Sequence, residues 1–297
     1  MFTLQDVLTR AGIAPQDVNV MLHSPRDGDM LTMLPGLVRT RRHAMETYQA
    51  AHSPLAERTL SQGRPWVASF VKTGPGRAPG TSAMLFAGLY QNHGGTRTPR
   101  AEIEANEEVQ WLYRSFGAFA EIARDDWTHW TWFDLRLDDA LADLQGRLLI
   151  ETRLTQTYVR LAENIDAPIA AIHATSTFDA GPPPWRDMVI SGGLLRALPL
   201  SWAAKLREWR GIYHILDASD GARYVGAAYG ADNLLGRWQQ HVAGAAGITA
   251  KLRARDPLNF RFSILERLAP DLDAREVTRR EQTWMTRLHT RGYGLNA

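Results

Sequence analysis

The sequence predicts an α+β protein of two domains. Its 297 residues exceed the usual size of one domain, and 44% hydrophobic with 22% charged residues is the balance of a folded chain. Short β-rich runs mix with stretches of helical periodicity, and a Gly-Pro-Pro-Pro run at residues 181–184 interrupts both patterns. We therefore expect a mixed α/β domain at 1–190, with a small bent sheet or partial barrel, and a second domain at 195–297.

The N-terminal domain begins with helical segments around one strand. Thr3 can cap a helix that Gly12 ends. Val18, Val20 and Leu22 recur at every second position, as in a strand, and residues 39–51 are polar enough for an exposed helix. Five β-rich runs follow before residue 174, and Gly, Pro and Asn are frequent between them. These runs are residues 66–71, 84–90, 130–133, 147–150 and 169–172. So many short strands predict a strongly bent sheet or a partly closed barrel.

An aromatic cluster coincides with the third of these runs. It consists of Trp127, His129, Trp130 and Trp132. Such a cluster could bind a metal or stack on a base, but the alternation is more typical of a strand that packs its aromatic side chains into a core. We favour the core interpretation.

Charge is distributed unevenly along the chain. Residues 195–297 contain 16 Lys and Arg against 10 Asp and Glu, whereas residues 1–194 contain 18 against 22. Within the acidic part, residues 58–100 hold six basic residues and no acidic one, which predicts a patch that faces phosphates. Residues 102–166 carry 14 acidic residues against six arginines, which argues against nonspecific wrapping of nucleic acid by the whole N-terminal half.

The composition also excludes several kinds of chemistry. The chain has no cysteine, so disulfides, thiolate metal sites and a cysteine nucleophile are excluded, and any metal must bind to oxygen or nitrogen. No run approaches the roughly 18–20 apolar residues of a membrane span, and the first residues lack a basic segment followed by an apolar one. We expect a cytoplasmic protein with no membrane partner.

The C-terminal domain starts with a β-hairpin. Residues 211–215 and 224–226 are predicted strands around a short turn, and each strand carries a tyrosine. A third strand is predicted at 259–265.

Two helices complete this domain. Asp232 can cap the first, on which Arg237 and His241 lie four residues apart and therefore on one face. The second is predicted from 273 to 291 and stops at Gly292.

The second helix contains a carboxylate in an unexpected position. Val277, Trp284 and Leu288 define its buried face, and helical geometry places Glu281 roughly 40° from the centre of that face. An ionised group there is costly unless an opposite charge compensates it. Glu281 is therefore either a salt-bridge partner of an arginine or a metal ligand, and both alternatives remain open from the residue alone.

Together these residues resemble the motif set of the GIY-YIG nuclease family. The set comprises Gly211-Ile212-Tyr213, then Tyr224-Val225-Gly226 after ten intervening residues, then Arg237, His241, Glu281 and Asn296. Each element is weak by itself, but the ordered set is specific. The resemblance covers about 195–297, and its one departure is Val225 where the family has Ile.

The resemblance implies a fold and an activity. The fold would be a three-stranded antiparallel sheet flanked by helices, and the activity would be hydrolysis of DNA phosphodiester bonds with one Mg²⁺ or Mn²⁺ ion per active site. Glu281 would be the only protein carboxylate on that ion, which suits a cation that keeps several waters. Arg237 would hold the scissile phosphate and stabilise its developing charge.

The resemblance also assigns roles to the remaining motif residues. Tyr213 would orient the attacking water and could accept its proton, with His241 as the alternative acceptor. Tyr224 would complete the hydrogen-bonding shell, and Asn296 would brace the site.

We expect the N-terminal domain to select the double-stranded DNA, with modified DNA among its conceivable targets. The residues expected to contact DNA are Arg64, Lys72, Arg77, Arg97, Lys251 and Arg253. A catalytic domain at the C-terminal side favours a restriction or defence endonuclease by family analogy, and one metal site would need a homodimer or two encounters for a double-strand break. The alternatives are a structure-specific repair nuclease and a catalytically silent nucleic-acid-binding protein.

Overall fold

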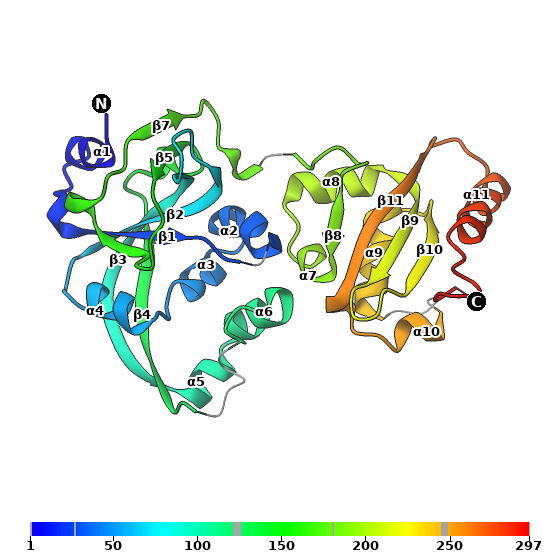
Figure 1. The fold of residues 1–297 in the computed structure, drawn as a ribbon, viewed down its shortest axis with the longest axis horizontal. Helices are drawn as coiled ribbons and strands as arrows, with labels where there is room; N and C mark the ends of the chain where they lie inside the picture. Colours follow the sequence, from blue (N-terminus) through cyan, green and yellow to red (C-terminus); the bar gives the residue numbers. More distant parts are fainter. Residues whose placement is uncertain (1, 27, 121–125, 180, 245–248, 297) are drawn as a thin grey trace. The chain divides into compact units, whose positions relative to one another are not determined.

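The chain forms two compact units in the computed structural model, unit 1 at Met1–Asp179 and unit 2 at Ala180–Ala297 (Figure 1). The structure describes residues 2–26, 28–120, 126–179, 181–244 and 249–296. Within these residues, no helix combines the length and hydrophobicity that a membrane crossing requires. The boundary lies before the proline run, so residues 181–190 belong to the second unit and not to the first.

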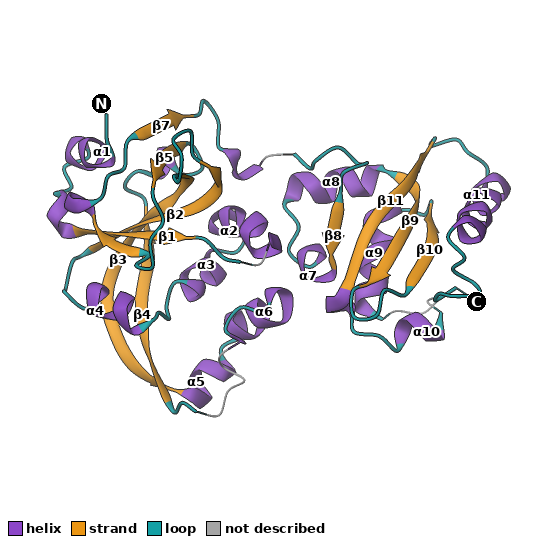
Figure 2. Ribbon diagram, viewed as in Figure 1, coloured by secondary structure: helices purple, strands orange, loops and turns teal. Residues whose placement is uncertain are grey.

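Unit 1 contains a seven-stranded mixed sheet in the order β6-β1-β2-β3-β5-β7, with β4 paired to β3 (Figure 2). Its strands are β1 (Val18–His23), β2 (Trp66–Pro75), β3 (Ser82–Pro99), β4 (His129–Asp138), β5 (Leu148–Thr152), β6 (Val159–Leu161) and β7 (Ile169–Ile172). Strands β1 and β2 are parallel, and the other pairs are antiparallel. The first residues of β3 pair with β5 and the later ones with β4, so the sheet curls into a half-barrel. The predicted bent sheet is confirmed.

Both faces of this sheet are buried, and side chains alternate between the two core clusters along each strand. In β1, Met21 points into one core cluster, whereas Val20 and Leu22 point into the other. Helices cover the sheet: α1 (Leu4–Arg10), α2 (Gly28–Thr40), α3 (Arg42–Tyr48), α4 (Pro54–Leu60), α5 (Arg100–Ala105) and α6 (Glu107–Phe116). Thr3 caps α1 as predicted, but the helix expected at 39–51 is the end of α2 followed by α3.

Strand β4 does not send its tryptophans into the core. Its buried apolar residues are Phe133 and Leu135. Trp130 and Trp132 remain half-buried, and Trp132 packs on Phe119 with 6.0 Å between ring centroids. The core interpretation of the aromatic cluster is therefore wrong for these two side chains.

Unit 2 contains a four-stranded antiparallel sheet in the order β10-β9-β11-β8. Its strands are β8 (Val189–Ser191), β9 (Arg210–Asp217), β10 (Arg223–Ala228) and β11 (Phe260–Leu268). Its helices are α7 (Gly192–Leu195), α8 (Leu200–Glu208), α9 (Asn233–Ala243), α10 (Ala250–Arg253) and α11 (Ala274–Arg287). The expected sheet had three strands; β8 is the addition, and its three residues are too few to show a period. Helix α11 also ends earlier than predicted, and His289 beyond it has a left-handed φ of 52°.

Because each unit has its own apolar core, we expect fragments 1–179 and 180–297 to fold separately. Calorimetry of the full chain should show two transitions, each within a few degrees of the transition of one fragment. A fragment without cooperative unfolding would show that the units depend on each other.

Candidate active site

Two tyrosines of neighbouring strands meet on one face of the unit 2 sheet. Tyr213 of β9 is in register with Gly226 of β10, so Tyr224 is its diagonal neighbour on the same face. Their ring centroids are 6.3 Å apart. A Cβ atom on Gly226 would lie 2.5 Å from Cζ of Tyr213 and would overlap its hydroxyl. The glycine therefore leaves the space that the Tyr213 ring occupies.

Helix α9 brings a guanidinium and an imidazole to these phenols. Arg237 and His241 share a helix face, and the buried Trp238 anchors the helix against Tyr213 with ring centroids 6.1 Å apart. His241 is only 2% exposed, and its Nε2 lies 2.6 Å from the Tyr213 hydroxyl. Arg237 lies within hydrogen-bonding reach of both phenols.

Burial keeps the uncharged forms of these groups at neutral pH. It lowers the pKa of His241 to about 3, and the positive charge of Arg237 acts in the same direction. Burial, followed by the proximity of Tyr224, raises the pKa of Tyr213 well above its ordinary value. Burial also raises the pKa of Tyr224. Since Arg237 donates toward the Tyr213 oxygen, we assign the Tyr213 proton to the hydrogen bond with Nε2 of a neutral His241.

Helix α11 contributes the carboxylate of Glu281. Burial raises its pKa, although the Ala227 backbone and the charges of Arg237 and Arg291 oppose this shift. Among the described residues, Glu281 has no ion-pair partner within 4 Å, so the salt-bridge alternative is not what the structure shows. Glu276 of the same helix is different, because it forms ion pairs with two arginines.

Asn296 holds the edge strand of the sheet. Its Oδ1 accepts from the Val225 N–H at 2.9 Å, and its Nδ2 donates to the Val225 carbonyl at 2.8 Å. Both bonds go to backbone next to Tyr224, and the side chain is buried. This geometry suits the bracing role that the family resemblance implies.

The residues expected to contact DNA in unit 1 do not form one patch. The Arg64 guanidinium donates to both carboxylate oxygens of Glu163, at 2.7 and 2.8 Å, so the structure does not support its prediction as a phosphate contact. Lys72 is half-buried on β2. Arg77 and Arg97 are exposed, but nearly all of β3 separates them, about 50 Å measured along the strand.

The two expected contacts of unit 2 lie on one short helix. Lys251 and Arg253 are exposed on α10, whose cap residue Thr249 donates from Oγ1 to the carbonyl of Leu295 at 3.0 Å. The helix is thereby linked to the segment that carries Asn296.

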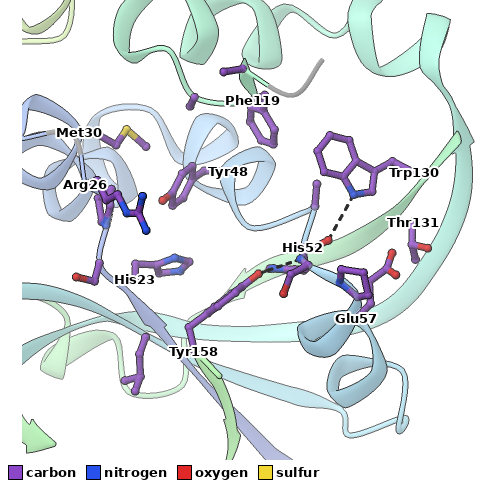
Figure 3. Close-up of a pocket in the computed structure, with 18 of the residues that line it drawn as sticks. His23, Arg26, Met30, Tyr48, His52, Glu57, Phe119, Trp130, Thr131 and Tyr158 are labelled. Atoms are coloured by element: carbon purple, nitrogen blue, oxygen red, sulfur yellow. Dashed lines mark hydrogen bonds between the residues drawn. The ribbon is translucent and has the colours of Figure 1, made fainter. Parts of the chain in front are cut away.

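A cavity in unit 1 that could not be predicted from the sequence contains two buried histidines, His23 and His52 (Figure 3). The two histidines are far apart in the sequence and show no ligand spacing. Only the topology of the sheet brings them together. In the described part of the chain, no cluster of three or more His, Asp or Glu could hold a metal ion.

Comparison with protein families finds no matching family model, and comparison with curated proteins finds no match. Two solved structures are similar to part of the chain. One is the catalytic domain of the intron endonuclease I-TevI in a mutant form, at 24% identity over 30% of this chain and 92% of that chain. The other is the catalytic domain of the homing endonuclease I-TevI, at 26% identity over 29% and 96%. Both TM-scores are 0.25, too low to support a functional assignment, which therefore depends on the residues themselves.

The packing around Gly226 predicts a loss of stability on substitution. Gly226→Ala should lower the free energy of unfolding of unit 2 by about 1–3 kcal/mol, because the new methyl group overlaps Tyr213. Gly230→Ala is the matched control, since nothing lies within 4 Å of its added Cβ. Urea unfolding of both variants measures the difference, and equal stabilities would contradict the packing.

The raised pKa of Glu281 predicts a pH-dependent cost. Its folded pKa exceeds its unfolded one, so stability falls as pH rises through the folded value and the carboxylate ionises. Glu281→Gln should therefore raise the melting temperature by about 2–5 °C at pH 7.5 in EDTA, and the gain should vanish near pH 4. Glu276→Gln loses ion pairs and should show no gain. A gain that persists unchanged at pH 4 would contradict the assignment.

Proposed function

We propose that unit 2 is the catalytic domain of a DNA endonuclease that hydrolyses phosphodiester bonds with a divalent cation. The observation that supports this best is the convergence of Tyr213, Tyr224, Arg237 and His241 from β9, β10 and α9, with Glu281 on a separate helix. Phosphoryl transfer needs a held phosphate, an oriented water and compensation of developing charge. This set of side chains contains a group for each requirement.

The residues around Glu281 fit a single hard cation. Its carboxylate is half-buried, its pKa is raised by burial, and it lacks an ion-pair partner among the described residues. One carboxylate that is not paired with a cationic side chain suits Mg²⁺ or Mn²⁺, which keep several waters and bind phosphate oxygens. A bound ion would supply Lewis acidity to the phosphate and lower the pKa of coordinated water.

Arg237 is the candidate for holding the scissile phosphate. A guanidinium stays charged at all relevant pH values and can donate two parallel hydrogen bonds to phosphate oxygens. It lies beside both phenols, so a phosphate bound there would also approach the tyrosines. The same charge helps to keep the imidazole neutral before substrate arrives.

Tyr213 and His241 form the candidate proton route. A phenol with so high a pKa is a poor base by itself. The Tyr213 oxygen can accept a proton from the attacking water while its own proton moves to Nε2 of His241, 2.6 Å away. No free phenolate forms on this route, and the negative charge of a bound phosphate would offset the cost of the imidazolium.

We propose that unit 1 selects the target and that the protein is of the restriction or defence type. The support is a separate unit with its own ligand-sized cavity, next in the chain to the candidate catalytic domain. A double-strand break would require a homodimer or two successive encounters, because one ion serves one strand.

Loss of Glu281 should abolish cutting. With Mg²⁺ and plasmid, branched and modified DNA as substrates, Glu281→Ala should reduce the rate at least about 10³-fold, whereas Glu276→Ala should cut nearly as fast as the wild type. Mg²⁺ should raise the melting temperature of the wild type and not of Glu281→Ala.

Each other outcome has a clear meaning. Equal rates for Glu281→Ala and the wild type would overturn the mechanism. Cutting confined to branched DNA would indicate a repair nuclease. Binding of DNA without cutting by the wild type would indicate a catalytically silent protein.

A further inference from the structure

Unit 1 contains a cavity of about 1090 Å³ that no step of the proposed hydrolysis uses. It lies where β1 ends, between α3, the start of α4, the end of α6 and strand β4 (Figure 3). Its volume lies just above the range of about 300–1,000 Å³ that is usual for pockets that bind small organic ligands.

Aromatic rings form much of the cavity wall. They belong to Tyr48, Phe119, Trp130 and Tyr158, which are half-buried and surround a common space (Figure 3). Two contacts hold Trp130 in place: its Nε1 donates to the His52 carbonyl at 3.4 Å, and its ring centroid lies 5.4 Å from that of Trp127. Held rings of this kind offer π faces to a flat ligand at low entropic cost.

Two histidines supply the polar groups of the cavity. His52 is only 6% exposed; its Nδ1 is 3.0 Å from the Tyr158 hydroxyl, and its buried Nε2 has no partner among the described residues. His23 is equally buried, and its Nε2 is held by Gln49 at 3.2 Å and Ser69 at 3.0 Å. An unpaired polar atom in such a place is costly, so His52 still has a hydrogen bond to gain.

The two buried histidines of the cavity are uncharged at neutral pH, and the half-buried Glu57 adds one acidic side chain to the lining. Burial lowers the pKa of His23 to about 4 and that of His52 to about 3. Arg26 and Arg97 also line the cavity and are exposed. With two arginines against one carboxylate in the lining, the fitting ligand is a flat, neutral, hydrogen-bonding ring attached to an anionic backbone.

We propose that this cavity binds one nucleobase extruded from the DNA. The proposal rests on the proposed function in one respect, that DNA is the substrate. Aromatic faces stack on any base, a neutral imidazole can pair with a base edge, and the arginines can hold the flanking phosphates. The volume leaves room for a substituent on the base, so enlarged bases fit as well as ordinary ones.

Photocrosslinking of the full-length protein in EDTA, where no cutting occurs, tests this proposal. The probe is a DNA duplex with one 5-iododeoxyuridine, either mismatched with guanine or paired with adenine, because a mismatched base is extruded at lower cost. We expect adducts on the cavity residues, mapped by mass spectrometry, with a higher yield from the mismatched duplex.

Two substitutions separate stacking on the cavity wall from a general effect. Trp130→Ala should reduce the affinity for the mismatched duplex at least about fivefold, and Trp130→Phe should restore most of it. Tyr113→Ala is the matched control, because Tyr113 is an exposed aromatic residue of the same unit outside the cavity. Melting curves confirm that each variant is folded.

The outcomes distinguish this proposal from the proposed function. Absence of cavity adducts from both duplexes would overturn the inference even if the protein cuts plasmid with Mg²⁺. Equal labelling of the cavity by free 5-iododeoxyuridine nucleoside would also overturn it, since the cavity would then bind a free nucleoside. Cavity adducts from a protein that never cuts would support base binding and reject the proposed nuclease activity.

Discussion

The candidate site depends on the burial of one phenol. Tyr213 fits between β10 and α9 only because Gly226 has no side chain, and its hydroxyl meets His241 in the interior. Burial then sets the chemistry of its neighbours: the imidazole is neutral, the phenols keep their protons, and Arg237 provides the permanent positive charge beside them. In this unit, the packing that fixes the position of Tyr213 therefore also sets the protonation states of the groups around it.

The elements that carry the unit 2 residues could be predicted because local spacing defines them. The two strands of the hairpin follow from the residues on either side of a short turn, and Arg237 and His241 share a helix face because they are four residues apart. Strand β8 could not be predicted, since three residues show no period and its pairing with β11 is made far along the chain. The end of α11 depends on the left-handed backbone conformation of His289, which a histidine at that position does not predict.

Long-range contacts explain what the sequence does not reveal in unit 1. Arg64 looks like a phosphate contact from its local charge, but its partner Glu163 is 99 residues away. Trp130 looks like a core residue from its alternation, but the curl of β3 and β4 directs it toward the cavity. Neither outcome can be predicted from neighbouring residues in the sequence, because each depends on contacts between distant segments of the curled sheet.

The parallel pairing of β1 with β2 has a consequence for how this protein could diversify. Parallel neighbours require a long connection, and here that connection carries Tyr48, His52 and Glu57 to the cavity. Substitutions in this one connection would change the shape of the cavity without altering a strand of the sheet. Descendants of this protein could thus acquire new cavity ligands while the candidate site of unit 2 stays unchanged.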